Sequence, residues 1–352
     1  MVEKTLLVEK KKEEVIEKKE NSKSEMEFPK IKEEVKPKKL SIEDLPGVGA
    51  ATAEKLREAG FDSMLAIAVA SPGELTEIAG LTEATARKII NTARSKMDMG
   101  FESGDQLLEK RKNILKVTTN SQALNNLFGG GIESGAITEC YGEFGVGKSA
   151  LAHQLAVNIQ LSKEKGGGEG MAVWLYTEST FRPERIKQIA ELNNLDPEKT
   201  LKNIKVARCF NSDHQMLLAE KVEDLITKDN LPVRLVIVDS LMGHFRSDFA
   251  GRGQLSDRQQ KLNKHMHVLQ KIASNYNLVV YITNQVMSKP DTFFGDPTAA
   301  IGGNIVGHNS TYRVYLRKGK KGTRVAKMID APHLPESEAI FQVTEKGLVD
   351  VT

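Results

Sequence analysis

The sequence has few of the residues that would tie it to an oxidising compartment or to a membrane. It holds only two cysteines in 352 residues, Cys140 and Cys209, which lie far apart, each in an apolar run. This spacing argues against a disulfide scaffold or a zinc site and predicts two buried thiols. No apolar run approaches the roughly 18 to 20 residues that span a bilayer, and the first residues lack a signal-peptide core. We therefore expect a cytoplasmic protein with no membrane partner.

An excess of charge of one sign is also missing. The chain carries 50 basic and 47 acidic residues, a formal net charge of +3. Whole-chain charge is therefore a weak argument for nucleic acid, and any basic surface must be local. Residues 1–39 are mostly Lys and Glu with scattered aliphatic side chains. Such a composition does not repay the entropy of ordering, so we predict a disordered charged tail there.

What the sequence does contain is a complete phosphate-binding loop. The matching residues are Gly142, Glu143, Phe144, Gly145, Val146, Gly147, Lys148 and Ser149. A strand-like run over 136–141 precedes the loop, and a helical pattern beginning at Ala150 follows it, which is the context that this motif requires. The glycines let backbone N–H groups face a polyphosphate at a helix N-terminus. We expect Lys148 to reach the β and γ phosphates and Ser149 to bind Mg²⁺.

Three later strand-like runs end in polar side chains, at Glu178, Asp239 and Gln285. The carboxyl ends of parallel strands meet at one edge of a sheet, where α/β proteins place their catalytic loops. There Asp239 would hold the Mg²⁺ shell, Glu178 would deprotonate the attacking water, and Gln285 would sense the γ phosphate. Each residue alone fits a helix cap equally well. Together, beside a phosphate loop, they predict a site that hydrolyses ATP.

The pattern of strands and helices predicts an α/β fold. The apolar runs are 136–141, 171–176, 204–209, 235–238 and 278–282. Because helical stretches separate them, they predict a buried, mainly parallel sheet with helices on both faces. The last third instead alternates polar and apolar residues, over 312–317, 324–329 and 340–344. We expect these segments to be antiparallel strands at one edge of the sheet, in a core that extends over 113–352.

A smaller helical domain is expected over residues 40–97. Its segment Pro46-Gly47-Val48-Gly49 lies between helical stretches and resembles the turn of a helix-hairpin-helix domain. The backbone N–H groups at Gly47 and Gly49 would suit a DNA phosphate without reading a base. A second, weaker match to the same turn follows at residues 79–81. The alternative, a helical domain that only packs on its neighbour, stays open.

Residues 98–112 are predicted to link the two domains. They carry a lone aromatic, Phe101, in a polar stretch that includes Gly104. An exposed aromatic on a linker can fill a pocket of a neighbouring copy, giving a head-to-tail assembly, or it can pack on its own chain. The linker residues themselves do not decide between these possibilities.

Five further segments, taken in order, carry a family resemblance. They are 180–185, 251–253, 258–262, 294–297 and 330–335. From about Ser41 onward the chain resembles the archaeal RadA-type recombinases of the RecA superfamily. The resemblance implies a RecA-like, DNA-dependent ATPase that forms filaments on single-stranded DNA and exchanges strands with a homologous duplex. Two alternatives remain, a paralogue-type mediator that binds ATP and DNA but exchanges strands poorly, and a ring-shaped motor of the same fold.

The resemblance also implies roles for single residues. Arg185 would lie near the adenine, while Asp330 and Pro332 would cap the ATP of the adjacent subunit, where potassium can bind. Phe101 and Gly104 would match the linker motif that docks on a neighbour in a homo-oligomer.

Two loops are expected to contact DNA. The residues are Arg246, Arg252 and Arg258 in the first loop, and Lys289 and Phe293 in the second. Cationic groups bind backbone phosphate whatever the sequence, and apolar side chains can wedge between base steps. The basic run 317–324 equally fits a solvated hairpin tip or a patch that faces the duplex.

At five positions the chain departs from the family pattern: Ala150, Tyr176, Met242, Gly243 and Asn304. The acid usual at 176 and the histidine usual at 304 are missing, and these changes predict weaker coupling between DNA binding and hydrolysis. Because the phosphate-loop and strand-end residues are kept, we expect ATP binding and hydrolysis to persist.

Overall fold

The computed structural model describes residues 41–61, 63–96, 103–288 and 298–351. It forms two compact units, Met1–Ser103 and Gly104–Thr352. The predicted tail over 1–39 lies outside the described residues, as do Phe101, Lys289 and Phe293.

The first unit consists of short helices. They are η1 (Ile42–Asp44), α2 (Ala50–Glu58), α3 (Met64–Val69), α4 (Pro72–Ala79) and α5 (Glu83–Lys96). The start of α4 is fixed by a capping box, in which the Glu74 N–H donates to the Ser71 hydroxyl at 3.3 Å and the Ser71 N–H donates to the Glu74 carboxylate at 2.7 Å. The core is aliphatic and includes Leu56 and Ile67, both fully buried. The helical stretches predicted on either side of residues 46–49 are confirmed as η1 and α2.

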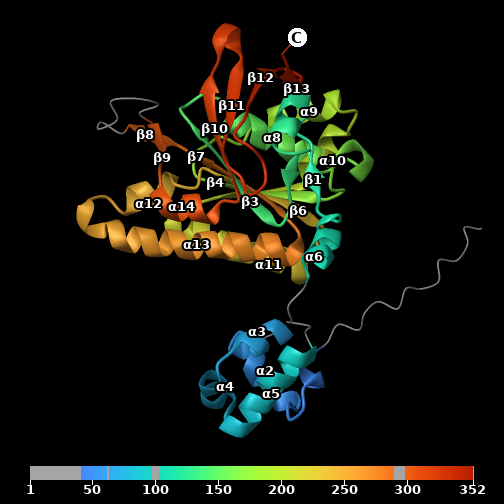
Figure 1. The fold of residues 1–352 in the computed structure, drawn as a ribbon, viewed down its shortest axis with the longest axis vertical. Helices are drawn as coiled ribbons and strands as arrows, with labels where there is room; N and C mark the ends of the chain where they lie inside the picture. Colours follow the sequence, from blue (N-terminus) through green and yellow to red (C-terminus); the bar gives the residue numbers. More distant parts are fainter. Residues whose placement is uncertain (1–40, 62, 97–102, 289–297, 352) are drawn as a thin grey trace, which may run out of the picture. The chain divides into compact units, whose positions relative to one another are not determined.

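The second unit is built on a nine-stranded sheet with the order β13-β12-β11-β10-β3-β7-β6-β4-β5 (Figure 1). The strands are β3 (Ala136–Gly142), β4 (Met171–Tyr176), β5 (Ile204–Arg208), β6 (Val233–Asp239), β7 (Val279–Asn284), β10 (Tyr312–Lys318), β11 (Arg324–Asp330), β12 (Glu338–Thr344) and β13 (Gly347–Asp350). The sheet is mostly parallel, as predicted. The three alternating segments form β10, β11 and β12, and β11 pairs antiparallel with both neighbours, as predicted. Strand β10 also pairs parallel with β3, which joins these strands to the parallel part of the sheet. The direction of the strands therefore reverses between β10 and β11.

Two short ladders lie outside this sheet. Strands β1 (Lys116–Val117) and β2 (Ile132–Glu133) pair before the phosphate loop, and β8 (Val286–Ser288) pairs with β9 (Thr298–Ala300) after β7. The second ladder joins the two described ends of the segment that was expected to form the second DNA loop.

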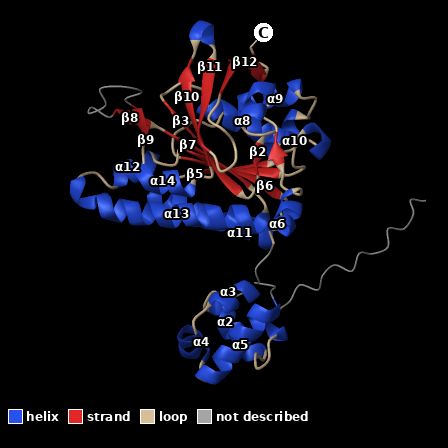
Figure 2. Ribbon diagram, viewed as in Figure 1, coloured by secondary structure: helices blue, strands red, loops and turns tan. Residues whose placement is uncertain are grey.

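Helices cover both faces of the sheet (Figure 2). They are α6 (Gly104–Arg111), α7 (Gln122–Leu127), α8 (Lys148–Asn158), α9 (Pro183–Leu192), α10 (Pro197–Lys202), α11 (Ser212–Thr227), α12 (Gly243–Asp248), α13 (Leu255–Tyr276) and α14 (Gly303–Asn309), with the 3-10 turns η2 (Lys163–Lys165), η3 (Arg252–Gln254) and η4 (Lys320–Gly322). Residues 104–111, expected in the linker, form α6 in the second unit. Within the described residues, no helix combines the length and the apolar character needed to cross a bilayer.

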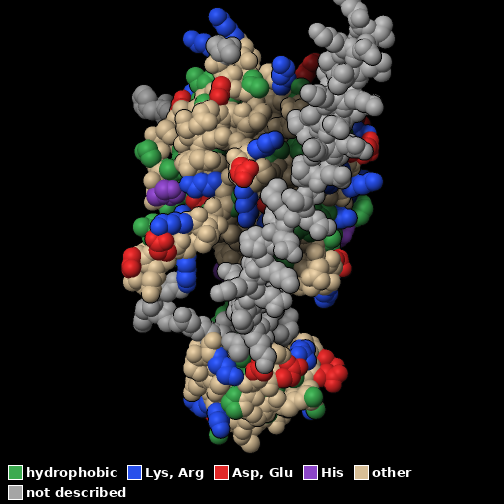
Figure 3. All heavy atoms as spheres, turned by 90° about the vertical axis from the view of Figure 1, so that its right-hand side faces the viewer, with side chains coloured by type: hydrophobic (Ala, Val, Ile, Leu, Met, Phe, Trp, Pro, Cys, Tyr) green, Lys and Arg blue, Asp and Glu red, His purple; other side chains and the backbone are tan. Residues whose placement is uncertain are grey.

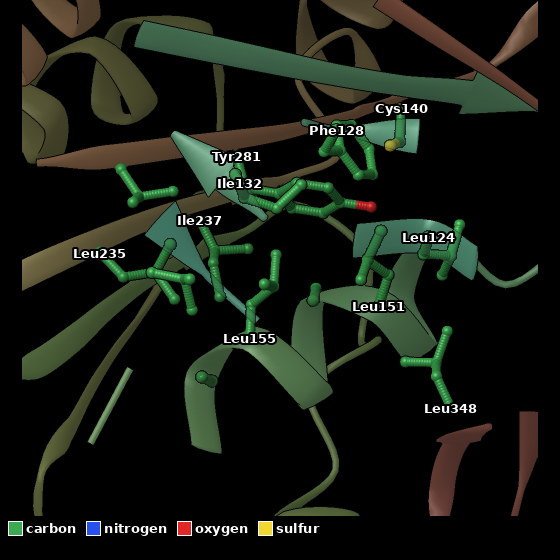
Figure 4. Close-up of a cluster of buried hydrophobic side chains, with 14 of the residues drawn as sticks. Leu124, Phe128, Ile132, Cys140, Leu151, Leu155, Leu235, Ile237, Tyr281 and Leu348 are labelled. Atoms are coloured by element: carbon green, nitrogen blue, oxygen red, sulfur yellow. The ribbon is translucent and has the colours of Figure 1, made fainter. Parts of the chain in front are cut away.

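The core forms two apolar layers because successive side chains of a strand point to opposite faces. In β7, Tyr281 joins the layer of α8 and α9, while Val280 and Ile282 join the layer of α11 and α13. Figure 4 shows the first layer, with Leu155 of α8 and Ile237 of β6 near Tyr281. The Tyr281 hydroxyl donates to the carbonyl of Lys148 at 2.9 Å, so this layer also supports the start of α8.

The two cysteines lie inside the second unit as free thiols, as expected. Burial raises the pKa of Cys140 and of Cys209 to about 12. Both therefore remain protonated and act as small apolar side chains in the core.

Candidate nucleotide site and nucleic-acid loops

The phosphate loop joins the end of β3 to the start of α8. Gly145 and Gly147 have φ of +78° and +106°, a left-handed conformation in which a side chain would be strained. Gly147 is the N-cap of α8, so the first N–H groups of that helix have no acceptor in the preceding turn. A helix start of this kind suits an anion.

A pocket of about 810 Å³ lies over this loop. The predicted residues that line it are Gly142, Glu143, Phe144, Gly145, Gly147, Lys148, Ser149, Ala150, Glu178, Asp239 and Gln285. Val146 is the exception within the loop, because its side chain is buried in the apolar core. The structure therefore brings the phosphate loop and all three strand-end residues to one pocket, although they are far apart in the sequence.

Lys148 is held inside the loop. Its ammonium donates to the carbonyls of Gly142 at 2.8 Å and Glu143 at 2.7 Å. Burial lowers the pKa of Lys148, while the nearby carboxylate of Asp239 opposes that shift. An anion entering the pocket would offer this cation a charged partner in place of two neutral carbonyls.

Asp239 supplies an open carboxylate oxygen. The residue is 3% exposed, and one carboxylate oxygen accepts a hydrogen bond from the Thr283 hydroxyl. The other carboxylate oxygen is buried and has no hydrogen-bond partner in the described part of the chain. A buried carboxylate oxygen without a partner is costly, and a water on a divalent cation would satisfy it. The site therefore fits Mg²⁺ held by the Ser149 hydroxyl and, through water, by Asp239.

A chain of hydrogen bonds connects Glu178 to Arg246, one of the residues expected to bind DNA. The Gln285 amide nitrogen donates to a Glu178 carboxylate oxygen at 2.9 Å, and the Gln285 amide oxygen accepts from the Arg246 guanidinium at 3.4 Å. Arg246 is exposed on α12, just after β6. A phosphate that drew Arg246 away would remove one of the two bonds that orient Gln285.

The other predicted DNA residues are placed in part. Arg258 is half-buried on α13, and the side chain of Arg252 lies outside the described set. In the first unit Gly47 has φ of +89°, and Gly49 is the N-cap of α2. Neither glycine N–H donates to an acceptor among the residues described, so both are available to a phosphate oxygen.

The expected adenine and cap residues lie outside this pocket. Arg185 of α9 donates to the carbonyls of Thr344 and, at 2.8 Å, Glu345, and so ties α9 to the turn between β12 and β13. Asp330 is the last residue of β11, and Pro332 lines a second pocket of about 440 Å³. Within one chain these residues do not reach the phosphate loop.

Comparison with known protein families agrees with both units. A family model described as Rad51 matches residues 110–351, and a model described as a SAM-like helix-hairpin-helix tandem matches residues 40–95. The chain belongs to the Rad51 family. It is thus a RecA-superfamily protein of the Rad51/RadA recombinase type with an amino-terminal helix-hairpin-helix domain, and both domains support DNA binding.

Several further residues line this pocket of the Rad51-family core and were not predicted from the sequence. They are Ser179, Thr180, Arg182, Ser240, Thr283, Val286, Arg324 and Val343. Arg324 is notable because its Nε atom is buried without a hydrogen-bond partner among the described residues. It comes from β11, far along the chain from the loop, and the sequence marks it only as part of the basic run 317–324, not as a residue of this pocket.

A buried polar network at the end of β7 was also missed. The Asn284 amide nitrogen donates to Glu139 at 2.8 Å and to the Ile301 carbonyl at 2.6 Å, and Glu139 pairs with Arg313 at 2.7 Å. Asn284 and Glu139 are fully buried. The network anchors the strand end that carries Gln285 and the return of the following loop. The one signal in the sequence was a glutamate within the apolar run 136–141.

The basic run 317–324 of this Rad51-family chain forms the end of the β10–β11 hairpin. Lys320 and Lys321 lie at its exposed tip, and Figure 3 shows Lys and Arg side chains at the top of this unit. Arg317 pairs with Glu338 at 3.0 Å, and Arg324 lines the phosphate pocket. The tip of the run is therefore exposed to solvent, whereas Arg324 at its end lines the pocket over the phosphate loop.

Three departures from the family pattern are accounted for by the packing around them. Met242 is buried in the layer of α11 and α13. At Gly243 an added Cβ would lie 2.6 Å from the Thr177 hydroxyl, too close for a side chain without a shift. Tyr176 packs half-buried against the layer of α8. Each substitution is therefore accommodated by its local packing.

Proposed function

We propose that this protein is an ATP-dependent strand-exchange recombinase of the archaeal RadA type. It would assemble on single-stranded DNA, pair that strand with a homologous duplex and exchange the strands during DNA repair. Membership of the Rad51 family supports the class of reaction. The observation that carries the proposal is the chain of hydrogen bonds from Arg246 through Gln285 to Glu178, because it links an exposed cation to the carboxylate beside the phosphate loop.

In this proposal the pocket holds ATP. The N–H groups of the loop and the Lys148 ammonium bind the phosphates, and Arg324 adds a second cation from β11. When bound, Mg²⁺ would neutralise part of the phosphate charge, with the Ser149 hydroxyl and Asp239 as its protein partners. Glu178 takes the proton of the attacking water, and Gln285 holds that carboxylate only until DNA binds.

DNA would act on hydrolysis through Arg246. A backbone phosphate bound by this guanidinium competes with the 3.4 Å hydrogen bond to Gln285. Gln285 is then free to turn its amide toward the γ phosphate, and Glu178 is released to the water. This sequence would make hydrolysis depend on DNA.

Self-assembly is supported by an open sheet edge. Strand β5 ends the order of the large sheet, and Val206 in the middle of β5 is 40% exposed. The outer backbone groups of β5 pair with no other described strand, and such an edge can accept an extended segment from another copy. We propose that the segment around Phe101 and Gly104 supplies such a contact in a head-to-tail filament. Asp330 and Pro332 would then cap the neighbour's ATP, where potassium can bind.

The test is strand exchange between a labelled single strand and a homologous duplex, with ATP and Mg²⁺. We expect the wild type to form product and the Lys148→Ala variant to form none. Exchange by Glu178→Gln would show that assembly with bound ATP suffices, without hydrolysis. A wild type that binds ATP and DNA yet never exchanges strands would contradict the proposal and favour a mediator. Electron microscopy of the same mixture would distinguish filaments from closed rings.

A further inference from the structure

The phosphate-loop helix carries a buried histidine that neither the loop motif nor the strand ends account for. His153 lies one turn after Ser149 on α8 and is 4% exposed. Both of its ring nitrogens have partners. The Nδ1 atom lies 2.6 Å from the Ser149 carbonyl oxygen, and the Nε2 atom lies 3.0 Å from the backbone nitrogen of Arg182.

These partners define which of the two ring nitrogens carries the hydrogen. A carbonyl oxygen can only accept, so Nδ1 carries the proton and donates to Ser149. A backbone N–H can only donate, so Nε2 is the unprotonated nitrogen and accepts from Arg182. The ring thus joins an acceptor on one element to a donor on another, which a purely apolar side chain of the same shape cannot do.

The Arg182 N–H donates to His153 and has no other acceptor among the described residues. Arg182 is the N-cap of α9, Pro183 follows it, and no side chain caps this helix start. The segment from Glu178 to Arg182 contributes Ser179 and Thr180 to the phosphate pocket. The histidine therefore fixes the far end of the segment that begins with Glu178.

Aromatic rings enclose the same contact. The His153 ring lies 4.7 Å from Trp174 and 6.0 Å from Phe181 between ring centres, and it stacks on Phe181 at 15°. Trp174 and Phe181 meet edge to face at 5.2 Å. Trp174 belongs to β4, whose chain continues directly into Glu178. Packing and hydrogen bonding thus hold the 178–182 segment against α8.

We propose that His153 is a positioning residue that latches the 178–182 segment onto the phosphate-loop helix and so sets the place of Glu178 relative to the phosphates. The inference rests on the proposed ATP hydrolysis. Its physical basis is that one donor and one acceptor on a rigid ring connect the backbone of Ser149 to the segment that carries the base. A small displacement of a catalytic group costs far more in rate than in binding.

Two substitutions separate the two hydrogen bonds. In His153→Gln the amide oxygen can reach the place of Nε2 and accept from the Arg182 N–H. In His153→Asn the amide nitrogen can take the place of Nδ1 and donate to Ser149, which leaves the Arg182 N–H without its acceptor. Both variants lose the aromatic ring, so the loss of packing is common to them. A matched control is His265→Gln, at a fully buried histidine on α13 whose ring stacks on Phe245 in the other layer.

We expect His153→Asn to lower kcat for ATP about tenfold while KM changes less than about twofold. His153→Gln should keep kcat within about threefold of the wild type. His265→Gln should lower Tm without changing kcat. Equal kcat in the Asn and Gln variants, or a loss that follows Tm across all three, would overturn the inference while leaving ATP hydrolysis by the wild type intact.

A second readout does not require hydrolysis. Trp174 is the chain's one tryptophan and is fully buried beside the latch. If the Arg182 contact holds the segment down, acrylamide should quench Trp174 fluorescence more in His153→Asn than in His153→Gln. Identical quenching would contradict the latch. A wild type without ATPase activity would refute the proposed function, and the quenching difference would still report on the contact itself.

Discussion

The two units of the molecule differ most in what they bury. The core of residues 41–96 is aliphatic, and every buried polar side chain of the described residues lies in the second unit. There the buried groups include Glu139, Asp239 and Asn284, which cluster around the ends of β3, β6 and β7. Burying a polar group is costly unless it is paired. Under the proposed function, the first unit only presents backbone N–H groups and needs no buried polar group, whereas the second unit must fix charges around a phosphate.

Ion pairs show the same contrast. In the first unit Arg87 and Glu83 pair along one helix face, with side chains 64% and 65% exposed. In the second unit Arg313 pairs with Glu139, whose side chain is fully buried. The first pair is screened by water and contributes little, while the second holds a charge that has no other partner of opposite sign in the structure as described.

The largest effect is expected at Lys148. Lys148→Ala removes the cation of the phosphate loop and should weaken ATP binding about a hundredfold or more, because a charged hydrogen bond in a water-poor site is lost. Titration calorimetry with ATP and Mg²⁺ measures this. The first unit should be untouched, so duplex binding through its hairpin should match the wild type. Wild-type ATP affinity in the variant would mean that the loop does not bind the phosphates.

Glu178→Gln should act on rate alone. The amide keeps the shape of the side chain and a hydrogen bond to Gln285 but cannot accept the proton, so kcat should fall by about 10²- to 10⁴-fold. The Kd for ATP should stay within about twofold, because no phosphate contact changes. Steady-state hydrolysis and equilibrium binding on the same preparation give both numbers. A normal kcat would require another base.

The two ion pairs give a direct test of the contrast in burial. Arg313→Met should lower the free energy of unfolding of the second unit by about 3 to 5 kcal/mol, because Glu139 is left charged and buried. Arg87→Met should lower that of the first unit by less than about 0.5 kcal/mol. Denaturant unfolding followed by circular dichroism measures both. A small loss at Arg313, similar to that at Arg87, would show that water reaches Glu139.

The smallest effects are expected in the hairpin of the first unit. Gly47→Ala puts a side chain on a residue at φ +89°, which should cost about 1 to 2 kcal/mol of stability and weaken DNA binding. Gly49→Ala is the matched control, since Gly49 has φ of −81° and nothing lies within 4 Å of an added Cβ. It should leave both properties within error. An equal loss of DNA binding at the two positions would point to side-chain crowding by DNA instead of backbone strain.

Much of the site could be predicted because its signals are local in the sequence. The phosphate loop needs glycines with φ above zero at fixed spacing, and Gly145 and Gly147 have them. Asp239 and Gln285 were found because apolar parallel strands end at the same edge of a sheet. The helical hairpin at Gly47 rests on a similar short-range pattern.

The sequence by itself therefore determined which chemical groups the pocket holds, and the tertiary structure decided how they are joined. The contacts from His153 to Arg182, from Arg313 to Glu139 and from β11 to the pocket through Arg324 connect distant segments. So does the parallel pairing of β10 with β3, which the alternating pattern alone did not reveal. Periodicity reports which face of an element is buried, whereas the partner across that face depends on strand order. Strand order is a property of the folded chain.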